Sequence, residues 1–169
     1  MIVALDACAL ISLCRKKSAE DDKRRLEWLI KRTKAARGRI IIPTPAFAEF
    51  CVWSSTEEIS LFDRRSPFLI APFDHRAAIE SSIIVRDVLN GGKKKPKDWQ
   101  RVKTDIQIAA IAKICNATQI VTTDGRLTAL SHRIALTPTL VKDLPLDEDD
   151  RQQPLFSADM PDHPAAGSW

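Results

Sequence analysis

The sequence has no long apolar run and no segment that resembles a secretory leader. None of its apolar stretches approaches the ~18 consecutive residues that a transmembrane helix needs. The N-terminal apolar stretch has no basic residues before it and ends at an acid, Asp6, unlike a signal peptide. We therefore expect a cytoplasmic protein that has no contact with a membrane.

Histidine is scarce, and the cysteines are not paired. The chain has three histidines and four cysteines, at Cys8, Cys14, Cys51 and Cys115. No two cysteines have the C-x-x-C spacing that is typical of zinc sites. Each cysteine lies among apolar residues, which favours buried, reduced thiols. A zinc site is therefore not expected.

The length and composition are those of a single globular domain. The chain has 169 residues, of which 44% are hydrophobic and 28% are charged. A domain of this size buries roughly 70% of the surface that its unfolded chain would expose. From residue 142 the sequence becomes acidic and contains prolines but few apolar residues. We expect one folded domain over 1–141 and a flexible acidic tail over 142–169.

Charge is unevenly distributed along the chain. The formal net charge is +4 and the sequence pI is about 9.0. Residues 15–39 hold eleven Lys and Arg against four acids, whereas 143–169 hold one Arg against seven acids. The basic segment indicates an anionic partner, nucleic acid first, or alternatively a solvated helix face.

Short apolar runs alternate with helical patterns. Apolar runs between turn residues are typical of buried, parallel strands, and the intervening segments repeat apolar residues at helical spacing. This alternation predicts an α/β fold, a three-layer α/β/α sandwich around a parallel sheet of four or five strands. The expected strands are 2–5, 40–42, 68–71, 119–122 and a short 133–136, and the expected helices are 19–36, 45–53, 74–89 and 98–115.

Two acids directly follow expected strands. Asp6 ends the first strand, and Asp124 follows the fourth. The carboxyl ends of parallel strands meet at one edge of a sheet, and ligands bind there in open α/β folds. Taken singly, each acid is equally compatible with a turn or a helix-capping residue.

Two further acids lie in apolar helical segments, Glu49 in PAFAEFCVW and Asp105 in KTDIQIAAIA. A buried carboxylate is costly unless it is paired or binds a metal, so each needs a partner unless it points to solvent. If all four acids meet, their mutual repulsion amounts to several kcal/mol, which a divalent cation would offset. Because the ligands on offer are oxygens, the sequence indicates Mg²⁺ or Mn²⁺.

Four segments together resemble the PIN-domain nucleases, and among them the VapC-like toxins of toxin–antitoxin pairs. The segments are IVALDACAL, IIIPTPAFAEF, KTDIQIAAIA and IVTTDGRL, in the family's order, within residues 1–140. The resemblance implies a PIN-like fold and a Mg²⁺- or Mn²⁺-dependent endoribonuclease that cleaves RNA. Its catalytic and metal-binding residues would be Asp6, Glu49, Asp105 and Asp124, with Glu49 as a metal ligand or as the base that orients the attacking water. It also implies a homodimer and, for a toxin, an antitoxin that covers the acidic cleft.

One position departs from the family pattern. Cys8 stands where the family usually has Ser, Thr or Asn, two residues after the first acid. A thiol is a weak hydrogen-bonding group, so weaker metal binding is expected. At the fourth strand, either Thr122 or Thr123 supplies the hydroxyl that the pattern requires.

Basic residues near the expected site are candidates for binding the RNA backbone. They are Lys93, Lys94, Lys95, Lys97, Arg101 and Lys103. Two other interpretations remain open. The chain could be a non-catalytic PIN-like module that binds RNA or acts as a scaffold. It could also be a phosphoryl-transfer domain, although phosphatases of that type have an Asp at the position of Cys8.

Overall fold

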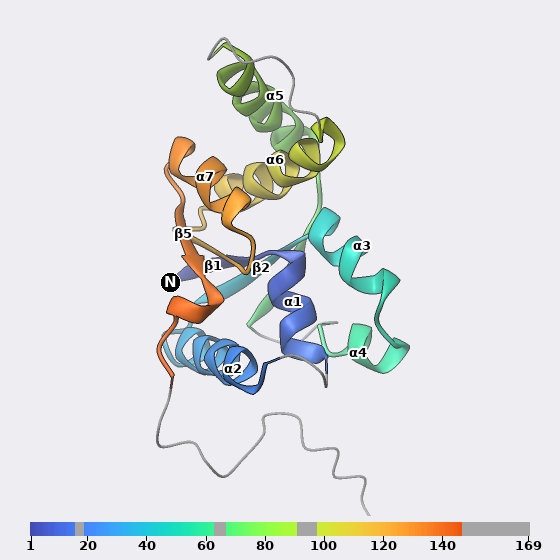
Figure 1. Ribbon diagram of the computed structural model, residues 1–169, viewed down its shortest axis with the longest axis vertical. Coiled ribbons are helices and arrows are strands. Elements are labelled where there is room, and N and C mark those ends of the chain that lie inside the picture. Colours follow the sequence, from blue (N-terminus) through green and yellow to red (C-terminus); the bar gives the residue numbers. More distant parts are fainter. Residues whose placement is uncertain (16–18, 63–66, 91–97, 147–169) are drawn as a thin grey trace, which may run out of the picture.

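The chain folds around a parallel sheet of five strands with helices on both faces (Figure 1). The computed structural model describes residues 1–15, 19–62, 67–90 and 98–146. The strands lie in the order β3-β2-β1-β4-β5, and every pair is parallel. This confirms the predicted three-layer α/β fold. Within the described ranges, no helix is long and apolar enough to cross a membrane.

The strands are β1 (Ile2–Leu5), β2 (Arg39–Pro43), β3 (Phe68–Ala71), β4 (Gln119–Thr122) and β5 (Thr137–Leu140). The helices are α1 (Ala7–Cys14), α2 (Glu20–Ala35), α3 (Thr44–Val52), α4 (Thr56–Ser60), α5 (His75–Asn90), α6 (Trp99–Ile114) and α7 (Gly125–Arg133). A short 3₁₀ helix, η1 (Val141–Asp143), follows β5.

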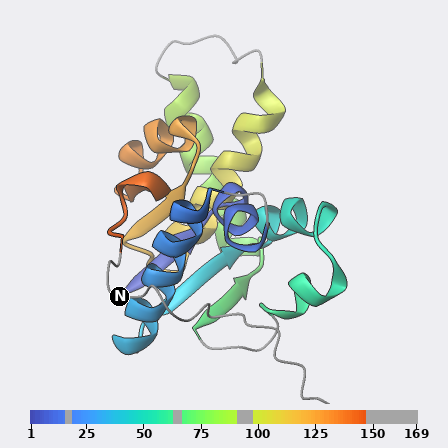
Figure 2. The same cartoon turned by 60° about the horizontal axis from the view of Figure 1, so that its bottom comes forward.

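The central strand, β1, is buried from both sides. Val3 and Leu5 belong to an apolar cluster with α1, α2 and α3, whereas Ala4 belongs to a second cluster with α5, α6 and α7. Figure 2 shows these two groups of helices on opposite faces of the sheet. Because β1 has buried neighbours on both faces, a continuous apolar run is the sequence that this position requires.

The prediction for the fifth strand was wrong in position. Residues 133–136 are not a strand, because α7 continues to Arg133 and the chain then turns through Ala135, which has a left-handed φ of 59°. The strand begins at Thr137 and contains Pro138, which lacks an N–H. An edge strand tolerates a proline, and β5 lies at the edge of the sheet.

The chain beyond β5 returns to α2. Val141 and Leu144 are buried in the same cluster as α2, and the Leu144 carbonyl accepts a hydrogen bond from the Arg25 guanidinium. Leu144 therefore packs with the domain although it lies beyond residue 141, the predicted boundary. The rest of the predicted tail, 147–169, falls outside the described residues.

Candidate active site

Asp6 is fixed at the junction between β1 and α1. Its backbone N–H donates to the Val121 carbonyl of β4 at 3.0 Å, and its carboxylate caps α1 by accepting from the Ala7 N–H at 2.7 Å. The residue is 6% exposed. A strand that runs directly into a helix thus places a buried carboxylate at the carboxyl edge of the sheet.

Thr122, the last residue of β4, links Asp6 to Asp124. Its buried hydroxyl donates to Asp6 Oδ2 at 2.9 Å and accepts from the Asp124 N–H at 2.9 Å. One hydroxyl can make both bonds because it has one proton to donate and lone pairs to accept with. Thr122 rather than the exposed Thr123 therefore supplies the hydroxyl that hydrogen-bonds to Asp6.

Cys8 also contacts the first acid. Its Sγ donates to Asp6 Oδ2 at 3.4 Å. Burial, followed by the negative charge of Asp6, raises the pKa of Cys8 to about 11, so the thiol keeps its proton at neutral pH. Cys8 thus occupies the expected hydrogen-bonding position with a weak donor. All four cysteines are free and half-buried, less buried than the sequence suggested.

Three carboxylates, Asp6, Asp105 and Asp124, act on one another electrostatically. Burial raises the pKa of Asp6, against the lowering effect of hydrogen bonds from Thr122 and Ala7. Burial and then the charge of Asp6 raise the pKa of Asp105, on α6, to about 6. The charge of Asp124 raises both pKa values further. The fold therefore places three of the four acids that the sequence singled out within electrostatic reach of one another.

Arg126, at the start of α7, pairs with the third acid. Its Nε lies 3.2 and 3.1 Å from the two carboxylate oxygens of Asp124, and its backbone N–H donates to Oδ1 at 2.9 Å. These hydrogen bonds hold the pKa of Asp124 below its usual value, and the Arg126 charge also opposes the rise at Asp105. Sequence reasoning missed Arg126. Its position two residues after a strand-end acid was the available signal.

Glu49 is exposed on α3, so of the two alternatives for this acid the structure shows the one that points to solvent. The apolar residues next to it gave a misleading signal, because Val52 and Trp53 are themselves 70% and 67% exposed. Helix α3 does pack against α1 and α6, which adjoin the other acids. Nevertheless, the groups that dominate the pKa values of Asp6, Asp105 and Asp124 do not include Glu49. Its catalytic role stays a prediction.

One of the predicted RNA-binding residues lies close to the acids. Arg101 is exposed on α6, and its charge lowers the pKa of both Asp105 and Asp124. Lys103 lies on the same helix and is partly exposed. Lys93, Lys94, Lys95 and Lys97 fall outside the described residues.

A pocket of about 400 Å³ adjoins the loop between β4 and α7. The loop residues Thr123 and Gly125 form one side of it, next to Asp124. The start of α2 and the end of β5 form the rest, with Asp22, Leu140, Val141 and Lys142. Both chain neighbours of Asp124 therefore line this pocket, whereas Asp6, Asp105 and Asp124 do not.

The donor chemistry of the site fits a hard cation. Asp6, Asp105 and Asp124 offer carboxylate oxygens, which Mg²⁺ and Mn²⁺ prefer, and burial together with the charge of a neighbouring acid raises the pKa of the first two. In the conformation described, Arg126 supplies the compensating charge to Asp124. Over the described ranges, no group of three or more His, Cys, Asp or Glu side chains lies close enough together to hold a metal ion.

Comparison with solved structures identifies proteins of similar fold. No protein-family model matches the chain, and no curated protein matches it by sequence. VapBC2 from Rickettsia felis, bound to a promoter DNA fragment, aligns with a TM-score of 0.59 and 17% identity over 83% of this chain and 98% of that chain. FitAcB from Neisseria gonorrhoeae aligns with a TM-score of 0.57 and 18% identity over 85% and 100% of the two chains. DNA-bound VapBC from Salmonella typhimurium aligns with a TM-score of 0.57 and 17% identity over 83% of this chain and 98% of that chain. At such identities the likeness shows a shared α/β fold and no more.

Proposed function

We propose that the protein is a Mg²⁺- or Mn²⁺-dependent endoribonuclease that acts as the toxin of a toxin–antitoxin pair. The observation that carries the proposal is the group formed by Asp6, Asp105 and Asp124, in which burial and mutual repulsion raise two of the three pKa values. The fold shared with two VapBC structures supports it, because VapC-like toxins are the nucleases that the sequence resembles.

In this proposal Asp6, Asp105 and Asp124 hold the cation, directly or through water. A bound Mg²⁺ or Mn²⁺ would lower the pKa of a water molecule and offset the charge that develops on the scissile phosphate. The Thr122 hydroxyl holds the Asp6 carboxylate in a single orientation. Glu49 is either a further ligand or the base that orients the attacking water.

Two arginines serve as counter-charges and phosphate contacts. Arg126 neutralises Asp124 before a cation binds, and its partly exposed guanidinium is then free to contact the phosphate. Arg101 lies within electrostatic reach of the same carboxylate. Lys103 is a further contact for the RNA backbone in this proposal, and the same role stays a prediction for Lys93, Lys94, Lys95 and Lys97.

The proposed partners are an antitoxin and a second copy of the chain. The similar structures include VapBC complexes, which supports a protein partner. The domain also exposes apolar side chains that such contacts would bury, on the end of α3 (Val52 and Trp53) and on α5 (Ile79 and Ile83). A toxin with these partners and an RNA substrate would act in the cytoplasm.

A non-catalytic RNA-binding or scaffold module is the second candidate. Two observations favour it: the weak thiol donor of Cys8 at Asp6, and the exposure of Glu49 on α3. A module of this kind would keep the PIN-like fold and bind RNA without cutting it.

RNA cleavage separates the two candidates. The wild-type protein should cut a mixed RNA substrate with Mg²⁺ or Mn²⁺ and stop cutting when EDTA is added. Asp6→Asn should abolish cleavage, whereas Asp87→Asn, which changes an exposed acid on α5, should leave it intact. The nuclease proposal fails if Asp6→Asn cuts RNA in Mn²⁺ as fast as the wild-type protein.

A further inference from the structure

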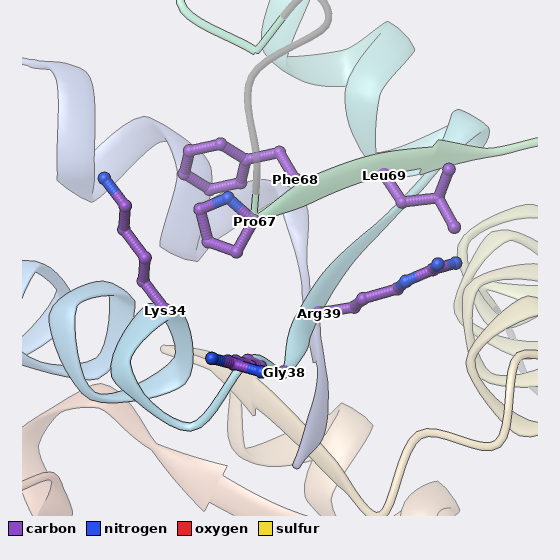
Figure 3. A pocket seen from close by; sticks show the side chains of 7 residues that line it. Lys34, Gly38, Arg39, Pro67, Phe68 and Leu69 are labelled. Carbon is purple, nitrogen blue, oxygen red and sulfur yellow. The ribbon is translucent and has the colours of Figure 1, made fainter.

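A second pocket lies at the sheet edge opposite the acids (Figure 3). It measures about 550 Å³ and lies where α2 ends and where β2 and β3 begin. Its lining includes Lys34, Arg37, Arg39, Phe68 and Leu69, and we call it the basic pocket. Among the described residues, no Asp or Glu lines it.

The three cations of the basic pocket have no acidic partner among the residues that the structure describes. Lys34, Arg37 and Arg39 are all exposed, and none of them forms an ion pair with an acid of the described ranges. Other cations of the domain do have such partners, as Lys113 has in Glu80. The basic pocket therefore keeps a positive charge that an anionic ligand can compensate.

The cations flank an apolar centre. In Figure 3, Lys34 of α2 and Arg39 of β2 point to opposite sides, and Pro67 and Phe68 lie between them. Leu69, which is 41% exposed, continues this apolar surface on the side of Arg39. A single small anion would reach one side of the arrangement. A chain in which anionic groups alternate with flat apolar groups matches both the cations and the apolar centre of the pocket.

A tight turn holds two of the cations in place. The Gly38 N–H donates to the Thr33 carbonyl at 2.8 Å, and the Arg39 N–H donates to the Met1 carbonyl at 3.0 Å. A Cβ on Gly38 would lie 2.2 Å from the Met1 carbonyl oxygen, so the backbone is packed too closely here to accept a side chain. Arg37 and Arg39 are thus mounted on a fixed backbone, which lowers the entropy lost when they bind a ligand.

We propose that the basic pocket binds a segment of single-stranded RNA. Backbone phosphates would lie at Lys34, Arg37 and Arg39, and bases would lie against Phe68 on one side and Leu69 on the other. Cationic grooves interleaved with aromatic and apolar surface are the usual means of binding single strands without reading their sequence. The choice of RNA as the strand rests on the proposed function.

The position of the pocket defines what it contributes. The strands are parallel, so the pocket and the acids are separated by the length of a strand, roughly 13 Å for four residues. Contacts at the basic pocket therefore add affinity for an RNA that extends beyond the scissile bond. They do not touch the reacting atoms.

The test is binding of a fluorescently labelled octauridylate, measured by anisotropy in EDTA with Asp6→Asn protein. The test variant, Lys34→Ala with Arg37→Asn, removes two charges, and Asn tolerates the left-handed φ of 50° at position 37. The control, Arg76→Ala with Arg86→Ala, removes two charges from exposed positions of α5. The test variant should raise Kd roughly tenfold and lower the slope of log K against log[salt] by about 1.4, and the control should do neither. Leu69→Ala should weaken binding without a change in that slope.

Several results would overturn the proposal. Equal Kd values for the test variant and its control would show that the pocket does not bind the strand. AMP that competes as well as the octamer would assign the pocket to a free nucleotide, and a polyglutamate peptide of equal charge that competes as well would assign it to polyanions in general. Arg39→Ala, which leaves the backbone bonds of β2 intact, repeats the measurement if the double variant does not fold. The binding test requires no cleavage. It therefore decides the role of the pocket even if the protein proves not to be a nuclease.

Discussion

Replacing Thr122 by Val removes a buried hydroxyl from the end of β4 while keeping the side-chain shape. The hydroxyl is 0% exposed, and it bridges the Asp6 carboxylate and the Asp124 N–H with two 2.9 Å bonds. The substitution leaves the buried carboxylate with one donor fewer and leaves the Asp124 N–H without its acceptor. We expect a large loss of stability for so small a change.

The magnitude follows from the two bonds. A hydrogen bond to a charged group contributes about 1.5–3 kcal/mol, and one between neutral groups about 1 kcal/mol. Thr122→Val should therefore lower the free energy of unfolding by about 2–4 kcal/mol at pH 7. For a chain of this length, each kcal/mol lowers Tm by roughly 2–4 °C.

Thr33 provides a matched control. It is also 0% exposed, but its hydroxyl has no hydrogen-bond partner in the structure described. Thr33→Val should be neutral or stabilising, because it removes a buried polar atom that makes no bond. Urea denaturation in EDTA measures both variants, and Thr122→Ser should restore most of the loss. Equal effects of the two Val substitutions would refute the role assigned to Thr122.

Three further predictions concern the site and the fold. The pKa of Asp105 is raised to about 6 from 3.8, so between these values the folded protein keeps a proton that the unfolded chain has lost. Stability should therefore fall as the pH rises from about 4 to 6, and Asp105→Asn should flatten that slope in urea titrations; an unchanged slope would contradict the assignment. Arg126→Ala should return the pKa of Asp124 to its ordinary value, which carboxyl NMR titration would detect, with little effect on stability because the pair is partly exposed. Gly38→Ala should destabilise the fold by about 1–3 kcal/mol, since its Cβ would overlap a carbonyl oxygen. Gly125→Ala is the control, because a Cβ there meets open space and should not change the stability. Thermal unfolding of both variants measures the difference.

The strand pattern could be predicted from the sequence because four of the strands contain short apolar runs bounded by turn residues. The short apolar helix α1, ACALISLC, could not be predicted, because an apolar run of eight residues has no polar face that would reveal a helical period. The fifth strand was misplaced because the left-handed turn at Ala135 uses a residue that carries no turn signal.

The site could be predicted where the acids follow strands, since parallel pairing alone brings Asp6 and Asp124 to one edge. Asp105 was recognised because its helix is buried among small and apolar residues. The exposure of Glu49 and the ion pair of Arg126 could not be predicted in this way. The first depends on how α3 is oriented on the sheet, which local sequence does not determine. The second depends on how the Arg126 side chain folds back onto Asp124, two residues before it.

Titration with Mn²⁺, with free Mn²⁺ followed by electron paramagnetic resonance, tests most directly whether the three carboxylates form one cation site. The wild-type protein should bind Mn²⁺, and Asp6→Asn, Asp105→Asn and Asp124→Asn should each weaken binding at least roughly tenfold. Asp87→Asn should bind as the wild type does. Absence of Mn²⁺ binding by the wild-type protein, or equal binding by Asp105→Asn, would contradict the site.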